Sequence, residues 1–413
     1  MSRTNPMVIK RKKDCLNKEK RGCPRVASFV LNGTDFLYKT GKSVYKQAVS
    51  RYNESRKERD FWKFMETKIV EIHQNRLSQS ILREAGQRIK NGELVAFPTE
   101  TVYGLGGDAL NPESARKIYA AKGRPSDNPL IVHICRLEDL SLLAREIPES
   151  AWLLAKHFWP GALTMILKKA EGVPKETTGG LDTVAVRMPS DPVALELIRQ
   201  AGGFVAAPSA NCSGRPSPTC SKYVIEDMNG RIEMILAGED SCIGLESTII
   251  DLTVPIPMIL RPGCITPAML ESVLEKVEAD PNILGKEGEE PPRAPGMRYR
   301  HYAPRGELTI VRGKPGEVTK RINELTDISR SRGKKTGVIC VEETRSFYRA
   351  DSIKSLGRRQ DGQEIAKQLY RILREFDEEK TEVIFSESFS EYGIGQAIMN
   401  RLLKAAGHRV IQL

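Results

Sequence analysis

The sequence predicts an α/β protein with α+β character: a mixed sheet in a large first domain, followed by a smaller C-terminal Rossmann-like α/β domain. Three observations predict this. Short apolar runs of strand length alternate with amphipathic segments along the 413-residue chain. Regular strand–helix alternation fails in the first part, which favours a mixed sheet. It becomes regular after residue 306, which is typical of a small parallel sheet with helical crossovers.

Helices of the first domain are marked by their ends. A helix over 80–90 places Ile81, Leu82, Ala85 and Ile89 on one face and ends at Asn91-Gly92. Asn111-Pro112-Glu113 is a helix start that leads to about residue 121, and Asp191-Pro192 opens a helix to about residue 200. Buried-type strands are predicted at 94–97, 130–134, 162–167, 184–188, 204–207, 232–236, 247–252 and 258–260, and a last helix at 267–277.

The domain pattern has four parts: an extension over 1–64, a first folded domain over 65–278, a linker over 279–306 and a C-terminal domain over 307–413. The end of the linker contains an unusual run, Arg298-Tyr299-Arg300-His301-Tyr302. Ordinary linkers are built from small and polar residues, so we expect this segment to bind a ligand or a partner. Strands are expected at 308–311, 336–341, 382–385 and 409–412, with helices at 316–331, 362–377 and 395–406.

Positive charge is concentrated in the first 64 residues. The chain carries a net charge of +11, but 17 of its 64 basic and 6 of its 53 acidic residues lie in 1–64, which leaves 47 of each sign elsewhere. We expect the extension to be disordered and dispensable, or an over-extended gene model. A basic surface for RNA is therefore not predicted for the folded body, although a local basic cleft stays open.

Other features bound the class of protein. No apolar run is long enough to cross a membrane, and no secretory signal is visible, so a cytoplasmic protein is expected. The eight cysteines form no Cys-x-x-Cys pair and no histidine cluster accompanies them, which argues against a zinc or redox centre.

A glycine-rich stretch follows the apolar run 94–97. Pro98 ends that run, Thr99, Thr101 and Tyr103 add hydroxyls, and Gly104, Gly106 and Gly107 permit tight turns and close approach to a ligand. The interpretation is a strand-to-loop ligand site; an ordinary glycine-rich connection is the alternative. The spacing also fits a degenerate dinucleotide fingerprint, but the next helix begins too late to hold a pyrophosphate.

Charged and polar residues after other strands and helices are candidates for an anion-binding site. Lys122 and Arg124 suit phosphate oxygens, although a solvated helix end has the same composition. Arg187 lies inside an apolar strand and needs an anionic partner, either a core carboxylate or a substrate. His133 stands in another apolar strand, where a lone histidine is more often a core residue.

Four short motifs follow one another along the chain: Lys122-Gly123-Arg124, Ser209-Ala210-Asn211, Glu246-Ser247-Thr248 and Arg261-Pro262-Gly263. In order and spacing they resemble the YrdC-type family of threonylcarbamoyl-AMP synthases, in its long two-domain form. The resemblance covers roughly residues 75–413. It implies a twisted, open sheet with a concave ligand face, and a linker that covers the active site. It also implies catalytic roles for Lys122 and Arg124. The implied L-threonine site comprises Thr101, His133, Arg187, Ser209 and Ser247, and the implied ATP site comprises Lys122, Arg124, Asn128, Thr183, Asn211, Thr219, Arg261 and Tyr302.

The implied reaction joins L-threonine, bicarbonate and ATP to give threonylcarbamoyl-AMP and pyrophosphate, the activated intermediate for threonylcarbamoyl-adenosine in tRNA. Mg²⁺ is expected with ATP, and a downstream tRNA-modifying transferase complex is the expected partner. The alternatives are a non-catalytic RNA-binding or ribosome-associated protein with weak RNA affinity, and a related carbamoyl-adenylating module of hydrogenase maturation. The zinc-binding cysteine pairs usual beside such a module are absent from this sequence.

Overall fold

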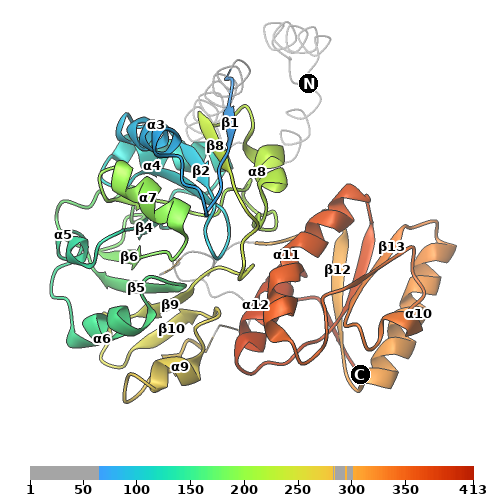
Figure 1. Ribbon diagram of the computed structural model, residues 1–413. Coiled ribbons are helices and arrows are strands. Elements are labelled where there is room, and N and C mark those ends of the chain that lie inside the picture. The colour runs from blue at the N-terminus through green and yellow to red at the C-terminus, as the bar shows by residue number, and fades with distance from the viewer. Residues whose placement is uncertain (1–64, 282, 284–293, 295–300) are drawn as a thin grey trace, which may run out of the picture. The chain divides into compact units, whose positions relative to one another are not determined.

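The computed structural model describes residues 65–281, 283, 294 and 301–413. The expectations for the extension over 1–64, and for most of the linker, fall outside these residues. Met65–Leu413 forms one compact unit with two sheets, one of eleven strands and one of five (Figure 1).

The larger sheet is mixed and open. Its strand order is β1-β8-β2-β3-β7-β4-β6-β5-β9-β10-β11. β4 and β6 run parallel, whereas β7 pairs antiparallel with both β3 and β4, which confirms the predicted mixed sheet. The strands are β1 (Lys68–Glu71), β2 (Val95–Phe97), β3 (Gly104–Asp108), β4 (Ile131–His133), β5 (Leu163–Lys168), β6 (Thr183–Arg187), β7 (Val205–Ala206), β8 (Met234–Ala237), β9 (Thr248–Asp251), β10 (Met258–Arg261) and β11 (Glu278–Ala279).

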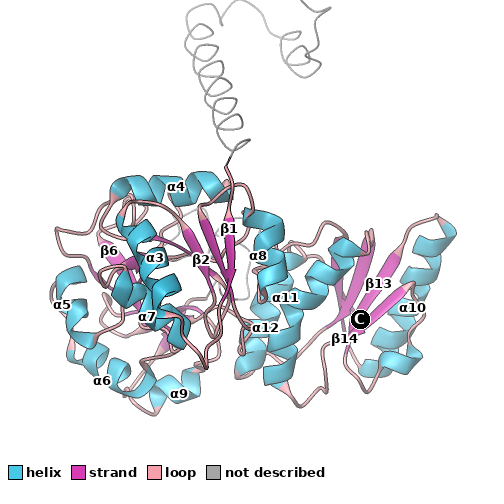
Figure 2. Ribbon diagram, turned by 45° about the horizontal axis from the view of Figure 1, so that its top comes forward, coloured by secondary structure: helices cyan, strands magenta, loops and turns pink. Residues whose placement is uncertain are grey.

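Helices cover this sheet. They are α3 (Gln79–Lys90), α4 (Pro112–Lys122), α5 (Leu140–Leu143), α6 (Glu149–Phe158), α7 (Pro192–Gln200), α8 (Ser221–Met228) and α9 (Pro267–Glu271). α3 and α7 lie side by side in both views (Figures 1 and 2). Their apolar faces share one buried core with β2 and β8, so burial of apolar surface fixes these helices on the sheet.

Two predicted helix starts are confirmed in detail. The Asn111 side chain accepts a hydrogen bond from the backbone N–H of Glu113, and the Asp191 carboxylate accepts from the N–H groups of Val193 and Ala194. The helix that begins at Asn111 ends at Lys122, where Gly123 takes a left-handed φ of 62°. The predicted helix over 267–277 is shorter than expected, since it ends at Glu271.

The glycine-rich stretch is not the predicted tight turn. Residues 104–108 form strand β3, paired antiparallel with β2, and none of its glycines has a positive φ. These glycines serve packing instead. A Cβ on Gly106 would lie 2.9 Å from the Phe97 ring and 2.9 Å from Val205 Cγ1. The preceding residues, 98–103, form the loop, and this loop and Gly104 at the start of β3 reach a pocket.

The five-stranded sheet is entirely parallel, as predicted, in the order β14-β13-β15-β12-β16. That order differs from the Rossmann order, because β15 lies between β12 and β13. α11 and α12 lie on one face and α10 on the other (Figure 1). The elements are β12 (Glu307–Arg312), β13 (Thr336–Cys340), β14 (Ser352–Ser355), β15 (Val383–Glu387), β16 (Val410–Gln412), α10 (Pro315–Ser331), α11 (Gly362–Glu378) and α12 (Ile394–Ala405).

Candidate active site

The site lies where the loop after β2 meets the loop after β7. The backbone of Ala210 donates to the carbonyl of Tyr103, and that of Leu105 donates to Pro208. These bonds place the loop of Ser209 and Asn211 along the start of β3, and Gly104 at this junction leaves room for the Phe97 ring. Two motifs that are about 110 residues apart in the sequence thus form one wall.

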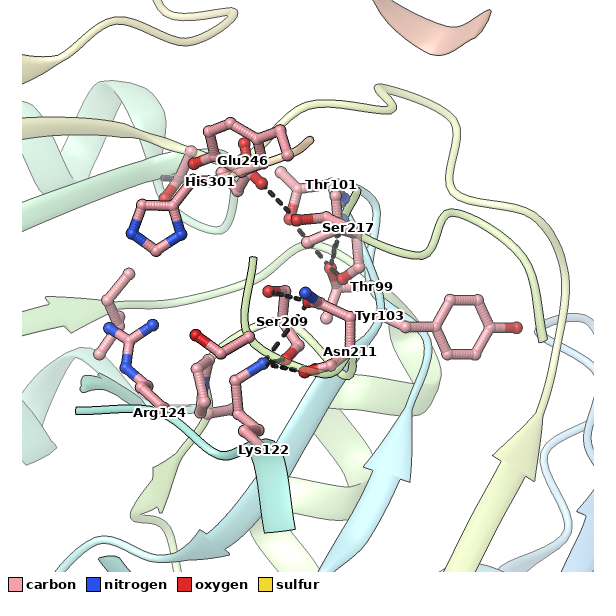
Figure 3. Close-up of a pocket in the computed structure, with 18 of the residues that line it drawn as sticks. Thr99, Thr101, Tyr103, Lys122, Arg124, Ser209, Asn211, Ser217, Glu246 and His301 are labelled. Atoms are coloured by element: carbon pink, nitrogen blue, oxygen red, sulfur yellow. Dashed lines mark hydrogen bonds between the residues drawn. The ribbon is translucent and has the colours of Figure 1, made fainter. Parts of the chain in front are cut away.

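A pocket with about 750 Å³ of space, part of it open to solvent, lies against this wall (Figure 3). It contains ten of the thirteen residues that the sequence proposed: Thr101, Lys122, Arg124, His133, Arg187, Ser209, Asn211, Ser247, Arg261 and Tyr302. Its shape and polar lining are typical of a small-molecule site.

Lys122 lies at the base of the pocket and contacts the backbone of the facing loop. Its Nζ donates to the carbonyl oxygens of Ser209 and Asn211, the latter at 2.6 Å (Figure 3). Burial, together with the nearby guanidinium of Arg124, lowers the pKa of this ammonium to about 7. Lys122 therefore ties the loop to α4 and carries a charge that an anion would stabilise.

Two arginines add positive charge. Arg124 is half-buried and donates to the carbonyls of Asn128 and Pro129, and burial lowers its pKa to about 10. Arg261 donates to the carbonyl and hydroxyl oxygens of Ser247, and burial likewise lowers its pKa to about 10. Among the described residues of the wall, five Lys and Arg side chains outnumber one carboxylate, so the pocket is suited to an anionic ligand.

Arg187 has the anionic partner that its strand position required. Its guanidinium donates to Glu100 Oε1 at 2.6 Å and to Thr101 Oγ1 at 2.9 Å. Burial opposes ionisation of Glu100, but the charge and hydrogen bonds of Arg187 outweigh it and lower the pKa of the carboxyl. Of the two alternatives, a core carboxylate is the partner, while Arg187 also lines the pocket.

His133 is a neutral wall residue. Burial and the neighbouring Arg187 lower the pKa of the imidazole to about 3. Its Nδ1 lies 3.2 Å from the carbonyl oxygen of Ile131 and is the protonated nitrogen if this contact is a hydrogen bond. An uncharged ring here can pack against an aliphatic group or exchange hydrogen bonds without adding charge.

Three proposed ATP residues do not line this pocket: Asn128, Thr183 and Thr219. Thr183 begins β6, and Thr219 accepts a backbone hydrogen bond from Ser241. Asn128 is buried, and its side-chain nitrogen and oxygen have no hydrogen-bond partner among the described residues. Their assignment to ATP stays a prediction.

Several wall residues escaped the sequence reasoning, and Glu246 is the most important of them. It is the only acidic residue among the described residues of the wall. Ser217, Tyr370 and Arg401 all donate to its carboxylate. Glu246 stands directly before the predicted Ser247, but its partners lie 29 to 155 residues away, and no local pattern predicts them.

The predicted linker reaches the pocket at its C-terminal end. His301 and Tyr302 line the wall, and the backbone of Ala303 donates to Gly214 on the opposite loop. Tyr302 has a left-handed φ of 64°, a strained conformation for a bulky residue. Residues 295–300, the other part of the expected lid, lie outside the described residues.

Comparison with known proteins matches two families along the chain. A family described as "Telomere recombination" matches residues 87–263, and one described as "Threonylcarbamoyl-AMP synthase, C-terminal domain" matches residues 265–407. A threonylcarbamoyl-AMP synthase of Pyrococcus abyssi is 47% identical over 84% of this chain and 100% of its own length. One from Bacillus subtilis is 48% identical over 80% of this chain and 94% of its own length.

A solved structure agrees with these relatives. The crystal structure of Sua5 from P. abyssi complexed with L-threonine is 47% identical, covers 84% of this chain and 100% of that one, and has a TM-score of 0.80. The two family matches, over 87–263 and 265–407, include the loop of residues 98–103 and four of the five strands of the smaller sheet. This chain therefore belongs to the two-domain threonylcarbamoyl-AMP synthase family.

Proposed function

We propose that the protein is an L-threonylcarbamoyladenylate synthase, a nucleotidyltransferase that forms threonylcarbamoyl-AMP and pyrophosphate from L-threonine, bicarbonate and ATP. One observation carries the proposal. Residues of the threonine set and residues of the ATP set, taken from separate strands and loops, line a single pocket. A ligand of each kind can therefore bind with its reacting group next to the other.

In this proposal, the triphosphate lies along the cationic side of the pocket. Arg124 and Arg261 supply charged donors that fit phosphate oxygens, and both remain protonated at neutral pH because their pKa values are about 10. Lys122 holds the loop of Ser209 and Asn211 and supplies a further positive charge at the base of the pocket. Asn128, Thr183, Thr219 and Tyr302 complete the proposed ATP set.

The threonine lies on the other side, near the strands. Arg187, with Thr101, is the proposed contact for its carboxylate. The neutral His133, with Ser209 and Ser247, is the proposed contact for its side chain and amine. Because the His133 imidazole stays uncharged above its pKa of about 3, it does not repel a protonated amine.

The chemistry proceeds in two steps. The threonine ammonium first releases a proton to solvent. The neutral amine then attacks the bicarbonate carbon, and loss of water leaves a carbamate. A carbamate oxygen then attacks the α-phosphorus of ATP, and the bond to the β-phosphate oxygen breaks to release pyrophosphate. Lys122, Arg124 and Arg261 stabilise the charge that develops on the phosphates. Exclusion of water protects the carbamate, a role we assign to the linker that ends at His301 and Tyr302.

Mg²⁺ enters the proposed reaction with ATP. The described residues contain no cluster of three or more His, Cys, Asp or Glu side chains suited to a metal ion. The wall carboxylate, Glu246, already accepts from three side chains. The protein therefore offers no metal cage of its own there, and the phosphates are the proposed ligands.

The proposal includes the use of the product. An acyl adenylate is a group donor, so a transferase complex that modifies tRNA is its proposed consumer. Among the described helices, none has the length and apolar character that a membrane span requires. We place the reaction in the cytoplasm, where ATP and tRNA are both available.

The test incubates purified protein with MgATP, bicarbonate and L-threonine. Pyrophosphate release is followed, and the adenylate is identified by mass spectrometry. Formation of product that depends on both threonine and bicarbonate is expected, and L-serine serves as the matched control because it lacks only the methyl group. ATP binding without any product would contradict the proposal.

A further inference from the structure

Two side chains from the five-stranded domain reach the back of the pocket wall. Tyr370 on α11 and Arg401 on α12 are completely buried. Neither lines the pocket, but both donate to the Glu246 carboxylate, which does. The second domain therefore contacts the wall of the site, and the bonds that both side chains donate to Glu246 indicate what this contact does.

Arg401 joins two backbone segments that carry pocket residues. Its Nε donates to Glu246 Oε2 at 2.9 Å, and its Nη1 donates to the carbonyl oxygen of Pro262 at 2.7 Å. Glu246 directly precedes Ser247, and Pro262 directly follows Arg261. One planar guanidinium thus sets the spacing between the start of β9 and the end of β10.

Sheet pairing alone does not set this spacing. β9 and β10 pair antiparallel, but their register shifts between Ile259 and Arg261. Beyond the shift, Arg261 is directed by its bonds to the Ser247 carbonyl at 3.1 and 2.9 Å and to the Ser247 hydroxyl at 3.1 Å. A change in the relative position of the two segments would therefore redirect the Arg261 guanidinium.

Charge gives Arg401 a second effect. Burial raises the pKa of Glu246, but the guanidiniums of Arg401 and Arg261 outweigh burial and hold it at about 2. The groups that face this carboxylate are Arg401, Arg261, Tyr370, Tyr302 and Ser217. Arg401, Tyr370 and Ser217 donate hydrogen bonds to this carboxylate, so Arg401 shares with Arg261 the charge of Glu246.

The same two side chains contact the linker. The ring of Tyr302 lies 5.2 Å from the ring of Tyr370, and the Arg401 guanidinium lies 5.9 Å from the centre of the Tyr302 ring. Tyr302, in its strained backbone conformation, is thus held by the same helices that hold Glu246.

We propose that Arg401 is a positioning residue for ATP binding: it pairs with Glu246 and fixes Pro262, so that Arg261 keeps its place and its charge for the phosphates. The inference rests on the proposed function, since it takes ATP as the ligand. It assigns the second domain a defined part in the catalytic pocket.

The experiment measures equilibrium ATP affinity for the full chain and its variants, from about pH 5 to about pH 9. In R401M the unpaired Glu246 turns to Arg261, and ATP binding is expected to weaken at least about tenfold. R401K keeps the positive charge but loses the planar guanidinium, so its ATP affinity is expected to lie between those of the wild type and R401M. In R401M/E246Q no carboxylate remains to neutralise Arg261, so ATP affinity is expected to rise about threefold or more above that of R401M, while the lost bond to Pro262 keeps it below that of the wild type.

The pH profile distinguishes this role from simple support of the fold. Without Arg401 the pKa of Glu246 rises. The ATP affinity of R401M, measured relative to that of the wild type at the same pH, is therefore expected to recover as the pH falls through this raised pKa. Glu246 is then protonated and no longer neutralises Arg261. R401M/E246Q is expected to lack this recovery, because it has no carboxyl at this position.

R374M is the matched control. Arg374 is also a completely buried arginine from these helices, but its partners, Asp227 and the Pro216 carbonyl, hold the part of the wall at Arg215, whereas Arg401 holds Glu246 and Pro262. Wild-type ATP affinity in folded R401M, or a double variant that binds no better than R401M, would overturn the inference. Product formation in the same samples separates the two proposals. ATP binding without product would contradict the proposed function alone. Product formation with the same ATP affinity in the wild type and the Arg401 variants would contradict the role of Arg401 alone.

Discussion

Two pairs of buried cationic side chains have different partners. Arg374 and Arg401 lie on the helices of the five-stranded sheet, and Lys122 and Arg261 lie in the pocket wall. Arg374 donates to both oxygens of Asp227, and Arg401 donates to Glu246. Lys122 and Arg261 contact chiefly neutral oxygens of Ser209, Asn211 and Ser247 in the described bonds. The former pairs balance charge, whereas the pocket keeps an excess of positive charge.

The pKa values express the same difference. Burial lowers the pKa of Lys122 to about 7 and that of Arg261 to about 10. Burial acts the same way on Arg401, but the Glu246 carboxylate outweighs it and raises the pKa. Buried charge thus stabilises the contact between the two sheets, and it prepares the pocket for an anion at some cost in stability.

The largest expected effect is on activity. Lys122→Ala and Arg124→Ala are each expected to reduce kcat/KM by about a hundredfold or more, because each removes a charge that stabilises the reacting phosphates. Steady-state pyrophosphate release provides the measurement, and thermal melting checks that the fold is kept.

Arg116→Ala is the matched control for these variants. Arg116 lies on the same helix, α4, but is half-exposed and pairs with Glu113 and Glu176 away from the pocket. It should retain wild-type turnover. If both pocket variants kept near-normal rates as well, the assignment of charge stabilisation to this wall would be wrong.

The next largest effect is on stability, in the balanced pairs. Arg374→Met removes one of the two guanidiniums that donate to the buried Asp227, while Arg215 keeps its own bond to this carboxylate, and it is expected to lower the free energy of unfolding by about 1–3 kcal/mol. Urea denaturation measures the loss. A double variant, R374M/D227N, should lose less than the sum of the two single changes, and additive losses would show that the pair is not coupled.

A smaller effect appears in the pH dependence of the pocket. The folded-state pKa of Lys122, about 7, lies below its unfolded value, so the folded state binds fewer protons between these values. Its contribution to stability is present at high pH and is lost as the pH falls through about 7. Bound ATP favours the protonated form of the Lys122 amine. ATP binding at pH 8 is therefore expected to be coupled to the uptake of at most about one proton.

Calorimetry of ATP binding in two buffers of different ionisation enthalpy measures this uptake. Lys122→Met should remove most of this proton uptake, because it has no amine to protonate. Equal proton uptake by the wild type and Lys122→Met would contradict a low pKa for this lysine.

The smallest effect is expected at the surface. Arg116→Ala should change the free energy of unfolding by less than about 1 kcal/mol, because solvent screens its pairs with Glu113 and Glu176. Urea denaturation at low and high salt measures it. A loss as large as that of Arg374→Met would remove the distinction between exposed and buried pairs.

Local chemistry in the sequence predicted much of this structure. The caps at Asn111 and Asp191 depend on side chains two or three residues from their partners, and both helices start where predicted. The strand position of Arg187 called for an anionic partner, which Glu100 provides. The family resemblance supplied ten residues that line one pocket.

Long-range contacts could not be predicted in the same way. Arg401 and Glu246 are 155 residues apart, and nothing near either residue indicates the other. Gly106 was interpreted as a turn residue because the sequence does not show that the Phe97 ring and Val205 occupy the space beside it. Packing of distant residues decided both cases.

Labelled bicarbonate tests the central claim most directly. The protein is supplied with MgATP, L-threonine and bicarbonate that carries heavy carbon, and the products are analysed by mass spectrometry. We predict an adenylate that contains threonine and the heavy carbon, formed together with pyrophosphate. Release of pyrophosphate without the heavy carbon in any adenylate would show that this pocket performs a different reaction.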